Sequence, residues 1–355
     1  MKILSLFRPR RVAARDSVMN ALAGLGTSRD KRSHTKWVMP YTLQQYELDA
    51  MYRGSWLARK IVDIPAMDMT RAWTSIIFDD DNPKLQFSME QAETRLALQR
   101  NICDALTWSR LYGGAVLIIG TLEADLTKPL VPERVRRGAL AFLRVIDKWN
   151  ISALPGQVSD PTSEYFGFPE FYQLQSGMRI HCSRLIRFDG ARLPYQQFIN
   201  NGMWHDSALQ SVYDSLLNAD TATQSVASML FEANVDVIKT DQLREMLAEK
   251  DGEKKITKRF QIAAAIKSFN RALLIDASEE YEKKSNTFSG IDAIMRQFML
   301  DVSGAADIPM TRLFGQSAAG LNATGDNDIR NYYDMVRARQ EIELRPALEK
   351  IYRII

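Results

Sequence analysis

The sequence holds few of the residues that build disulfides, metal sites and membrane spans. Its 355 residues include two cysteines and three histidines, too few for a disulfide framework and without the ligand spacing of a zinc site. No stretch approaches the ~20 apolar residues of a transmembrane helix, and the first residues do not form a convincing secretory signal. We therefore expect no metal, no cofactor and no membrane partner, and a reducing cytoplasm suits the two cysteines.

Catalytic motifs are also scarce. The stretch GQSAAG at 315–320 matches the first six positions of a Walker A loop, but Leu321 and Asn322 stand where that loop needs Lys and Ser or Thr, so an ATPase is not expected. The three adjacent aspartates at 79–81 lack the alternate spacing of a metal loop and predict an exposed turn. The sequence shows no catalytic residue of these kinds.

The net charge of +3 is distributed unevenly along the chain. Residues 1–36 hold nine Lys or Arg against Asp16 and Asp30, which leaves 37 basic and 41 acidic residues in the rest, from totals of 46 and 43. A basic arm before a mildly acidic body suits a tail that contacts a polyanion or a neighbouring subunit, or a solvated tail. Tight nucleic-acid binding by the body is not expected, because it requires a continuous basic face.

The first half of the chain predicts helices followed by strands. Residues 41–65 indicate two helices separated by Gly54, helix continues over 66–73, a strand is expected at 75–78, and 83–112 indicates two more helices with a break near Asn101. The pair Gly113-Gly114 predicts a helix C-cap before a buried strand. The expected strands are 115–119, 141–145, 171–174, 179–181 and 185–188. Helices followed by mostly β-structure indicate an α+β fold.

Two long amphipathic helices are expected further on. The first begins after Asp206 or Ser207 as N-cap and has a thin, polar middle at 218–225, which suits close packing against like helices or a water-filled channel. The second carries an apolar stripe over 291–306 and ends before Pro309. Between them lies a compact insert with predicted strands and helices.

Several unusual words follow one another near the C-terminus. They are IPMTRLFGQS at 308–317, GLNATG at 320–325, NYYDMVRARQE at 331–341 and LRP at 344–346. In this order they resemble the C-terminal core of tailed-bacteriophage portal proteins, in a branch formerly of unknown function whose domain name also mentions an anti-CBASS protein. The resemblance implies a structural, non-enzymatic protein.

Carried onto this chain, the resemblance implies a portal-like division. It comprises a basic flexible arm at 1–36, an α+β wing domain at 37–205, a first stem helix at 206–232, a small α/β clip insert at 233–287, a second stem helix at 288–308, a candidate tunnel loop at 309–327 and a C-terminal helical wing or crown part at 328–355.

The resemblance also implies partners and a place in the virion. It implies a homo-oligomeric, dodecameric ring at a capsid vertex, through which double-stranded DNA passes without sequence readout. The terminase large subunit and the capsid, scaffold and head–tail connector proteins are the implied partners, and the host cytoplasm is the implied location during assembly. The candidate DNA-channel residues are Gly315, Gln316, Ser317, Gly320, Asn322, Thr324 and Gly325. The candidate motor-docking residues of the clip are Lys250, Glu253, Lys254 and Lys255.

An alternative hypothesis rests on two His-x-Ser words. They begin at His181 and His205, and paired words of this kind are the signature of 2H phosphoesterases, in which two histidines act as acid and base on a phosphodiester. The alternative is thus a phosphoesterase that acts on cyclic oligonucleotides through these histidines. The short separation of the words and the position of the second before a helix cap speak against it.

Overall fold

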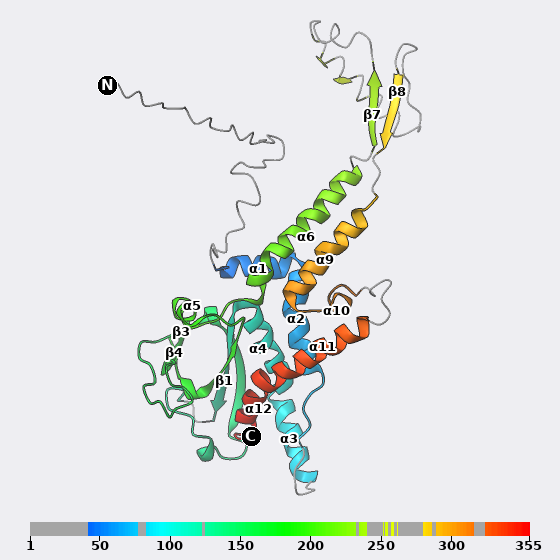
Figure 1. The fold of residues 1–355 in the computed structure, drawn as a ribbon. Coiled ribbons are helices and arrows are strands. Elements are labelled where there is room, and N and C mark those ends of the chain that lie inside the picture. Colours follow the sequence, from blue (N-terminus) through cyan, green and yellow to red (C-terminus); the bar gives the residue numbers. More distant parts are fainter. Residues whose placement is uncertain are drawn as a thin grey trace, which may run out of the picture. The chain divides into compact units, whose positions relative to one another are not determined.

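The computed structural model describes residues 42–76, 83–122, 125–231, 234–239, 280–285, 289–315 and 324–355, with a few single positions between 251 and 261. The basic arm predicted at 1–36, the aspartates at 79–81 and most of the predicted clip insert lie outside the described residues. The described fold combines helices with small antiparallel sheets (Figure 1), which confirms the α+β prediction. Within the described ranges, no helix is both long and apolar enough to cross a membrane.

Four helices, all predicted from the sequence, precede the first described strand. They are α1 (Gln45–Gly54), α2 (Trp56–Arg71), α3 (Pro83–Arg95) and α4 (Leu98–Tyr112). Ser55 separates the first two and caps α2 by accepting a hydrogen bond from the Ala58 amide. Helices α2 and α4 pack against each other and form the centre of the main hydrophobic core.

Strand β1 (Gly114–Thr121) is buried along nearly its whole length. It lies between β2 (Leu140–Asp147) and β6 (Leu185–Asp189), antiparallel to both. Its side chains alternate between two cores: Leu117 and Ile119 join the helical core, whereas Val116 and Ile118 join a second cluster. β1 therefore separates the two cores of the described chain.

The second cluster belongs to a smaller sheet. Strands β3 (Ile151–Ala153), β4 (Phe171–Leu174) and β5 (Arg179–His181) form it, and its buried members include Tyr172 and Ile180. The sequence predicted β4 and β5 but not the three-residue β3, which is too short to show a period. Helix α5 (Tyr195–Asn200) follows this part of the chain.

Two glycines where α4 meets β1 allow the segment just before α6 (Ala208–Phe231) to pack closely against them. Gly113 ends α4 with a φ of +89°, which confirms the predicted C-cap. A Cβ atom on Gly113 would lie 2.2 Å from the backbone oxygen of His205, and one on Gly114 would lie 2.2 Å from the Trp204 ring. The segment leading into α6 is thereby fixed against the start of β1.

Helices α6 and α9 (Ile291–Ala306) pack side by side, as expected for the two long helices (Figure 1). Their buried residues, Leu209, Val212 and Leu216 of α6 and Val302 of α9, join the main core. The thin polar middle of α6 at 218–225 is mostly exposed. Between the two helices, β7 (Asn234–Lys239) and β8 (Glu280–Ser285) pair antiparallel, so the insert begins and ends as a two-stranded sheet.

The C-terminal helices are α10 (Met310–Phe314), α11 (Thr324–Arg339) and α12 (Arg345–Tyr352). A π-helical turn at Gln340–Leu344 joins α11 to α12. The sequence predicts a kink or interruption at Pro346. The α-helix is interrupted by the π turn just before Pro346, and Pro346 itself lies in the first turn of α12, where its missing N–H is tolerated.

Three sequence predictions about local structure differ from the structure. Of the strand predicted at 75–78, residues 75 and 76 form no strand, and 77 and 78 lie outside the described residues. The helix break falls at Ala97, with a φ of 46°, because the Asn101 side chain donates to the Leu96 carbonyl and supports the first turn of α4. Ser289 with Asp292 three residues later predicts a side-chain N-cap at Ser289, whereas the N-cap of α9 is Gly290, with no side-chain cap hydrogen bond.

An arginine replaces a missing backbone donor inside α2. Pro65 has no N–H, so the Ile61 carbonyl, one turn earlier, has no helical partner. The Arg110 guanidinium of α4 donates to the Ile61 carbonyl at 2.8 Å and to the Val62 carbonyl at 3.1 Å. Burial lowers the pKa of Arg110 to about 10, so it remains a charged donor at neutral pH. Pro65 and Arg110 thus form one unit.

Arg110→Met should lower the free energy of unfolding by about 2 kcal/mol or more, because it leaves the Ile61 carbonyl without a donor. Pro65→Ala supplies a backbone N–H there, so the double variant should be less destabilised than the sum of the single changes. Denaturant unfolding measures all three. Arg100→Met, on the exposed face of the same helix, is the control. Strict additivity of the two changes would contradict the coupling.

Candidate functional site

Helix α10 and the start of α11 lie inside the range 309–327 predicted for the tunnel loop, on either side of residues 316–323. Gly315 is the C-cap of α10 with a φ of +70°, and Thr324 and Gly325 begin α11. The other predicted channel residues, Gln316, Ser317, Gly320 and Asn322, lie outside the described residues. The geometry of the site therefore comes from the helices on either side of the loop.

One buried carboxylate holds both of these helices to α2. The Asp68 carboxylate, 1% exposed, accepts two hydrogen bonds from the Arg312 guanidinium of α10, at 3.0 and 3.1 Å. It also accepts one from the Tyr332 hydroxyl of α11 at 3.0 Å. Arg71 adds a longer ion pair at 3.8 Å from the same helix as Asp68. We refer to Asp68, Arg312 and Tyr332 as the Asp68 clamp.

The charge states in the clamp follow from these contacts. The hydrogen bonds and charge of Asp68 raise the pKa of Arg312, so its guanidinium stays protonated. Burial and then the Asp68 charge raise the pKa of Tyr332, so its hydroxyl remains a neutral donor. A bidentate Arg–carboxylate pair also fixes orientation, which a single hydrogen bond does not. The clamp therefore sets both the position and the direction of α10 relative to α2.

A second set of contacts stabilises the C-terminal end of α10. Lys60 of α2 donates to the Leu313 carbonyl at 2.8 Å and lies over the Trp56 ring, with its Nζ atom 5.1 Å from the centroid. The Trp56 and Phe314 rings meet edge to face, with centroids 6.0 Å apart. A cation on the last carbonyls of a helix is favourable because of the helix dipole. The last turn of α10 is thus held to α2 by a hydrogen bond at Leu313 and by a ring contact at Phe314.

The words that carry the sequence resemblance meet at this place. In IPMTRLF, Ile308 and Leu313 are buried in the main core and Arg312 joins the clamp. In NYYDMVRARQE, Tyr332 joins the clamp and Gln340 donates to the Met69 carbonyl at 2.7 Å. Both words therefore describe contacts with the C-terminal part of α2.

Sequence reasoning missed Asp68 itself. The residue lies in a helix that reads as ordinary and amphipathic, and its partners are 244 and 264 residues away. The available signal was a carboxylate one turn after Ile64, on a side of the helix that is otherwise apolar and buried.

The predicted motor-docking residues are only partly described. Glu253 and Lys254 are exposed, and Lys254 forms an ion pair with Asp251 at 3.3 Å. Lys250 and Lys255 lie outside the described residues. An exposed ion pair of this kind contributes little to stability. The structure thus leaves the docking role of the clip a prediction.

The two histidines of the alternative hypothesis are engaged in separate local contacts. The His181 Nδ1 atom lies 2.8 Å from the Ser183 hydroxyl, and its ring packs edge-on against Phe171. The His205 Nδ1 atom accepts from the Leu193 amide at 3.0 Å, and its ring packs on Phe198. Burial lowers the pKa of both, so both are neutral at pH 7.

His181 and His205 do not both line the cavity beside His205. A cavity of about 580 Å³ is lined by His205 but not by His181. Among the described residues, no group of three or more His, Cys, Asp or Glu is arranged to hold a metal ion. The described geometry therefore does not assemble an acid–base pair from His181 and His205.

Comparisons with known proteins show a family and several similar chains. A family model described as phage portal protein matches residues 46–355. A protein named anti-CBASS protein Acb1, from Caulobacter sp. (strain RHG1), is 38% identical over 96% of this chain and 56% of its own length. An uncharacterized protein of Haemophilus influenzae is 32% identical over 94% of this chain and 75% of its own. The chain thus spans little more than half of the Caulobacter protein.

Solved structures show a similar fold. A chain in the virion of a native gene transfer agent particle superposes with a TM-score of 0.51 at 13% identity, over 86% of this chain and 77% of that one. A chain in the neck of an empty gene transfer agent particle, computed with C6 symmetry, gives 0.50 at 14% identity, over 81% and 74%. At these identities the likeness is one of fold.

Asp68→Asn should lower the free energy of unfolding by about 2 kcal/mol, because it removes the charge partner of the partly exposed Arg312 and leaves a weaker acceptor for Tyr332. Tyr332→Phe should cost about 1 kcal/mol. Amide hydrogen exchange should accelerate in both α10 and α11 of the Asp68 variant. Asp328→Asn, an exposed change on α11, is the control. Acceleration in one helix alone would show that the clamp does not join them.

Proposed function

This chain belongs to the phage portal protein family, and from that premise we propose that identical copies of it form a ring that conducts double-stranded DNA through one capsid vertex. The observation that carries the proposal is the Asp68 clamp, which holds the two helices that flank a short loop to one helix. The loop 315–325 contains no Lys or Arg. A channel loop that moves along a polyanion benefits from this, because each fixed phosphate contact resists translocation.

Exposed apolar residues on the two long helices support a ring. Leu217 and Met229 of α6 and Ile294 and Leu300 of α9 are exposed in the single chain. α6 carries no Lys or Arg along its length, and Asp214 and Asp220 are its charged residues. Neighbouring copies in a ring would cover apolar side chains of this kind. We infer that α6 and α9 are the stem helices and that the ring is dodecameric.

The remaining portal roles follow from the family. We assign 37–205 to the wing, 233–287 to the clip and 328–355 to the helical wing or crown part, with the arm at 1–36 ahead of them. The clip would dock the terminase large subunit and later the head–tail connector proteins, and capsid and scaffold proteins would contact the ring. The protein would then reside at the portal vertex of the virion, and in the host cytoplasm during assembly.

A second candidate function has one observation in its favour, the printed name of the Caulobacter relative. That name concerns a protein of which this chain spans 56%. The separate surroundings of His181 and His205 favour a structural role for both. Hydrolysis of a cyclic oligonucleotide by this chain, lost in His181→Ala and His205→Ala, would support the phosphoesterase instead.

Electron microscopy of the purified protein tests the proposal most directly. We expect closed rings with a central hole and a fixed subunit number. Leu217→Asp together with Ile294→Asp should yield single copies, since charges on the exposed apolar faces would oppose packing between subunits. Phe87→Asp together with Tyr195→Asp, which adds the same charge at exposed residues of α3 and α5, is the matched control. A compact monomer in the unaltered protein would overturn the ring.

Gln316→Lys with Asn322→Lys should permit ring assembly but slow or stall DNA packaging, because the added cations would bind passing phosphates. The measurement is the rate at which assembled proheads take up DNA. Gln316→Glu with Asn322→Asp adds charge of the opposite sign and should package at close to the normal rate. If the lysine variant assembles and packages normally, the loop does not lie at the constriction.

A further inference from the structure

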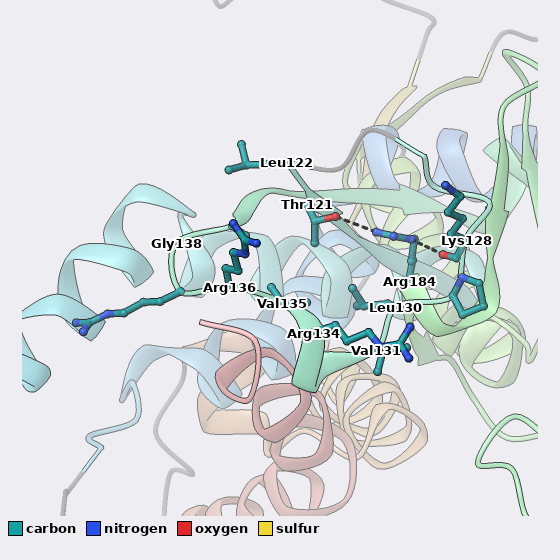
Figure 2. Close-up of a pocket in the computed structure, with 13 residues that line it drawn as sticks. Thr121, Leu122, Lys128, Leu130, Val131, Arg134, Val135, Arg136, Gly138 and Arg184 are labelled. Atoms are coloured by element: carbon teal, nitrogen blue, oxygen red, sulfur yellow. Dashed lines mark hydrogen bonds between the residues drawn. The ribbon is translucent and has the colours of Figure 1, made fainter.

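A basic hollow lies at the connection between β1 and β2. It is a cavity of about 930 Å³, lined by Thr121, Leu122 and residues 128–131, 134–139 and 184 (Figure 2). Five of the described lining residues are basic, and none is acidic. We use the name basic hollow for this cavity, whose cations are Lys128, Arg134, Arg136, Arg137 and Arg184.

Arg184 gives the hollow a fixed wall. Its side chain is buried, and its guanidinium donates to the Lys128 carbonyl at 2.7 Å and to the Thr121 hydroxyl at 3.2 Å. The Ser183 hydroxyl accepts from the Leu130 amide at 2.7 Å. These contacts tie the β1–β2 connection to the turn before β6, so the surface carrying the other cations is held in place.

Three arginines of the connection have no polar partner in the described part of the chain. Arg134, Arg136 and Arg137 are exposed, and no hydrogen bond or ion pair engages their guanidinium groups there. Figure 2 shows Arg134 and Arg136 extending in different directions. Groups spread in this way do not enclose a single phosphate or carboxylate. They suit an extended partner with several negative charges.

The positive surface continues beyond the hollow. A second cavity, of about 390 Å³, shares Arg137 and Gly138 with it and adds Arg95 of α3. On the connection itself, the acidic residues are Glu123, which lies outside the described residues, Asp125, which pairs with Lys128 at 3.7 Å, and the exposed Glu133. The arginines of the two cavities therefore form one strip with a surplus of positive charge.

Apolar side chains are exposed among these cations. Leu122 is 73% exposed and Val131 is 37% exposed, and both line the basic hollow. Arginine with exposed apolar groups is typical of surfaces that bind proteins. A DNA-binding face instead needs many phosphate contacts, whereas this strip offers few cations on a body of net negative charge.

We propose that the basic hollow binds an acidic segment of a partner protein, one with apolar side chains between its carboxylates. The carboxylates would pair with Arg134, Arg136 and Arg137, and an apolar side chain would enter the hollow beside Leu122 and Val131. The channel role proposed above does not use this surface, so the two proposals stand or fall separately.

A labelled peptide that alternates glutamate and leucine is the probe, and fluorescence anisotropy with the full chain is the measurement. Arg134→Glu, Arg136→Glu and Arg137→Glu together should weaken peptide binding about tenfold or more, because each change replaces an attraction by a repulsion. Arg53→Glu, Arg179→Glu and Arg337→Glu, which alter exposed arginines elsewhere by the same total charge, should leave binding within about twofold.

Three outcomes would overturn the proposal. Equal losses of peptide affinity in the two triple variants would mean that binding depends on net charge alone. Equal binding of a peptide with glutamine in place of glutamate would remove the role of the carboxylates. If the Arg134, Arg136 and Arg137 triple variant lost more affinity for a DNA duplex than for the peptide, the strip would be a nucleic-acid surface.

Hydrogen exchange provides a test that needs no variant. In the unaltered chain, the glutamate–leucine peptide should slow amide exchange within residues 125–139. Residues 195–200 of α5 serve as the internal control, because they line neither the basic hollow nor the adjoining cavity. Unchanged exchange over 125–139 at saturating peptide would contradict the assignment.

Discussion

The carboxylate of Asp68 is the group that holds the C-terminal helices against α2. It is almost fully buried, and a buried carboxylate without partners is very costly. Arg312 and Tyr332 satisfy it from two separate helices. An apolar replacement of the whole set could be equally stable, since buried ion pairs recover little more than their desolvation cost. The clamp contributes direction, because each donor must approach the carboxylate along a defined line.

The clamp gives a defined position to the helices on either side of residues 316–323, a segment without charged side chains. The segment after Gly315 consists of small and amide side chains with little apolar area to bury. The helices on either side of this segment are, however, held to α2. The contacts that hold them are the clamp, Lys60 and the Trp56–Phe314 pair. The clamp thus sets the positions of the flanking helices independently of the composition of residues 316–323.

Sequence patterns predicted the elements better than their connections. The apolar periods of α6, α9 and β1 are strong, because each element buries one face or both, and these were found. The break was predicted near Asn101 and lies at Ala97, and the Asn101 amide donates to the Leu96 carbonyl just before the break. The Asp68 clamp was missed because period and propensity are local, and its partners lie on distant helices. The two sequence motifs that carry the resemblance, IPMTRLF and NYYDMVRARQE, lie largely in α10 and α11, but they did not indicate that these helices contact Asp68.

The exchange of a backbone hydrogen bond for a side-chain one in α2 restricts the order in which this sequence can change. A lineage that first replaces Pro65 regains a backbone donor for the Ile61 carbonyl, and Arg110 then becomes free to vary. A lineage that first loses Arg110 passes through a protein with an unpaired carbonyl in its core. Loss of Arg110 is therefore costly to stability as long as Pro65 is present, whereas Pro65 can be replaced first without leaving the Ile61 carbonyl unpaired.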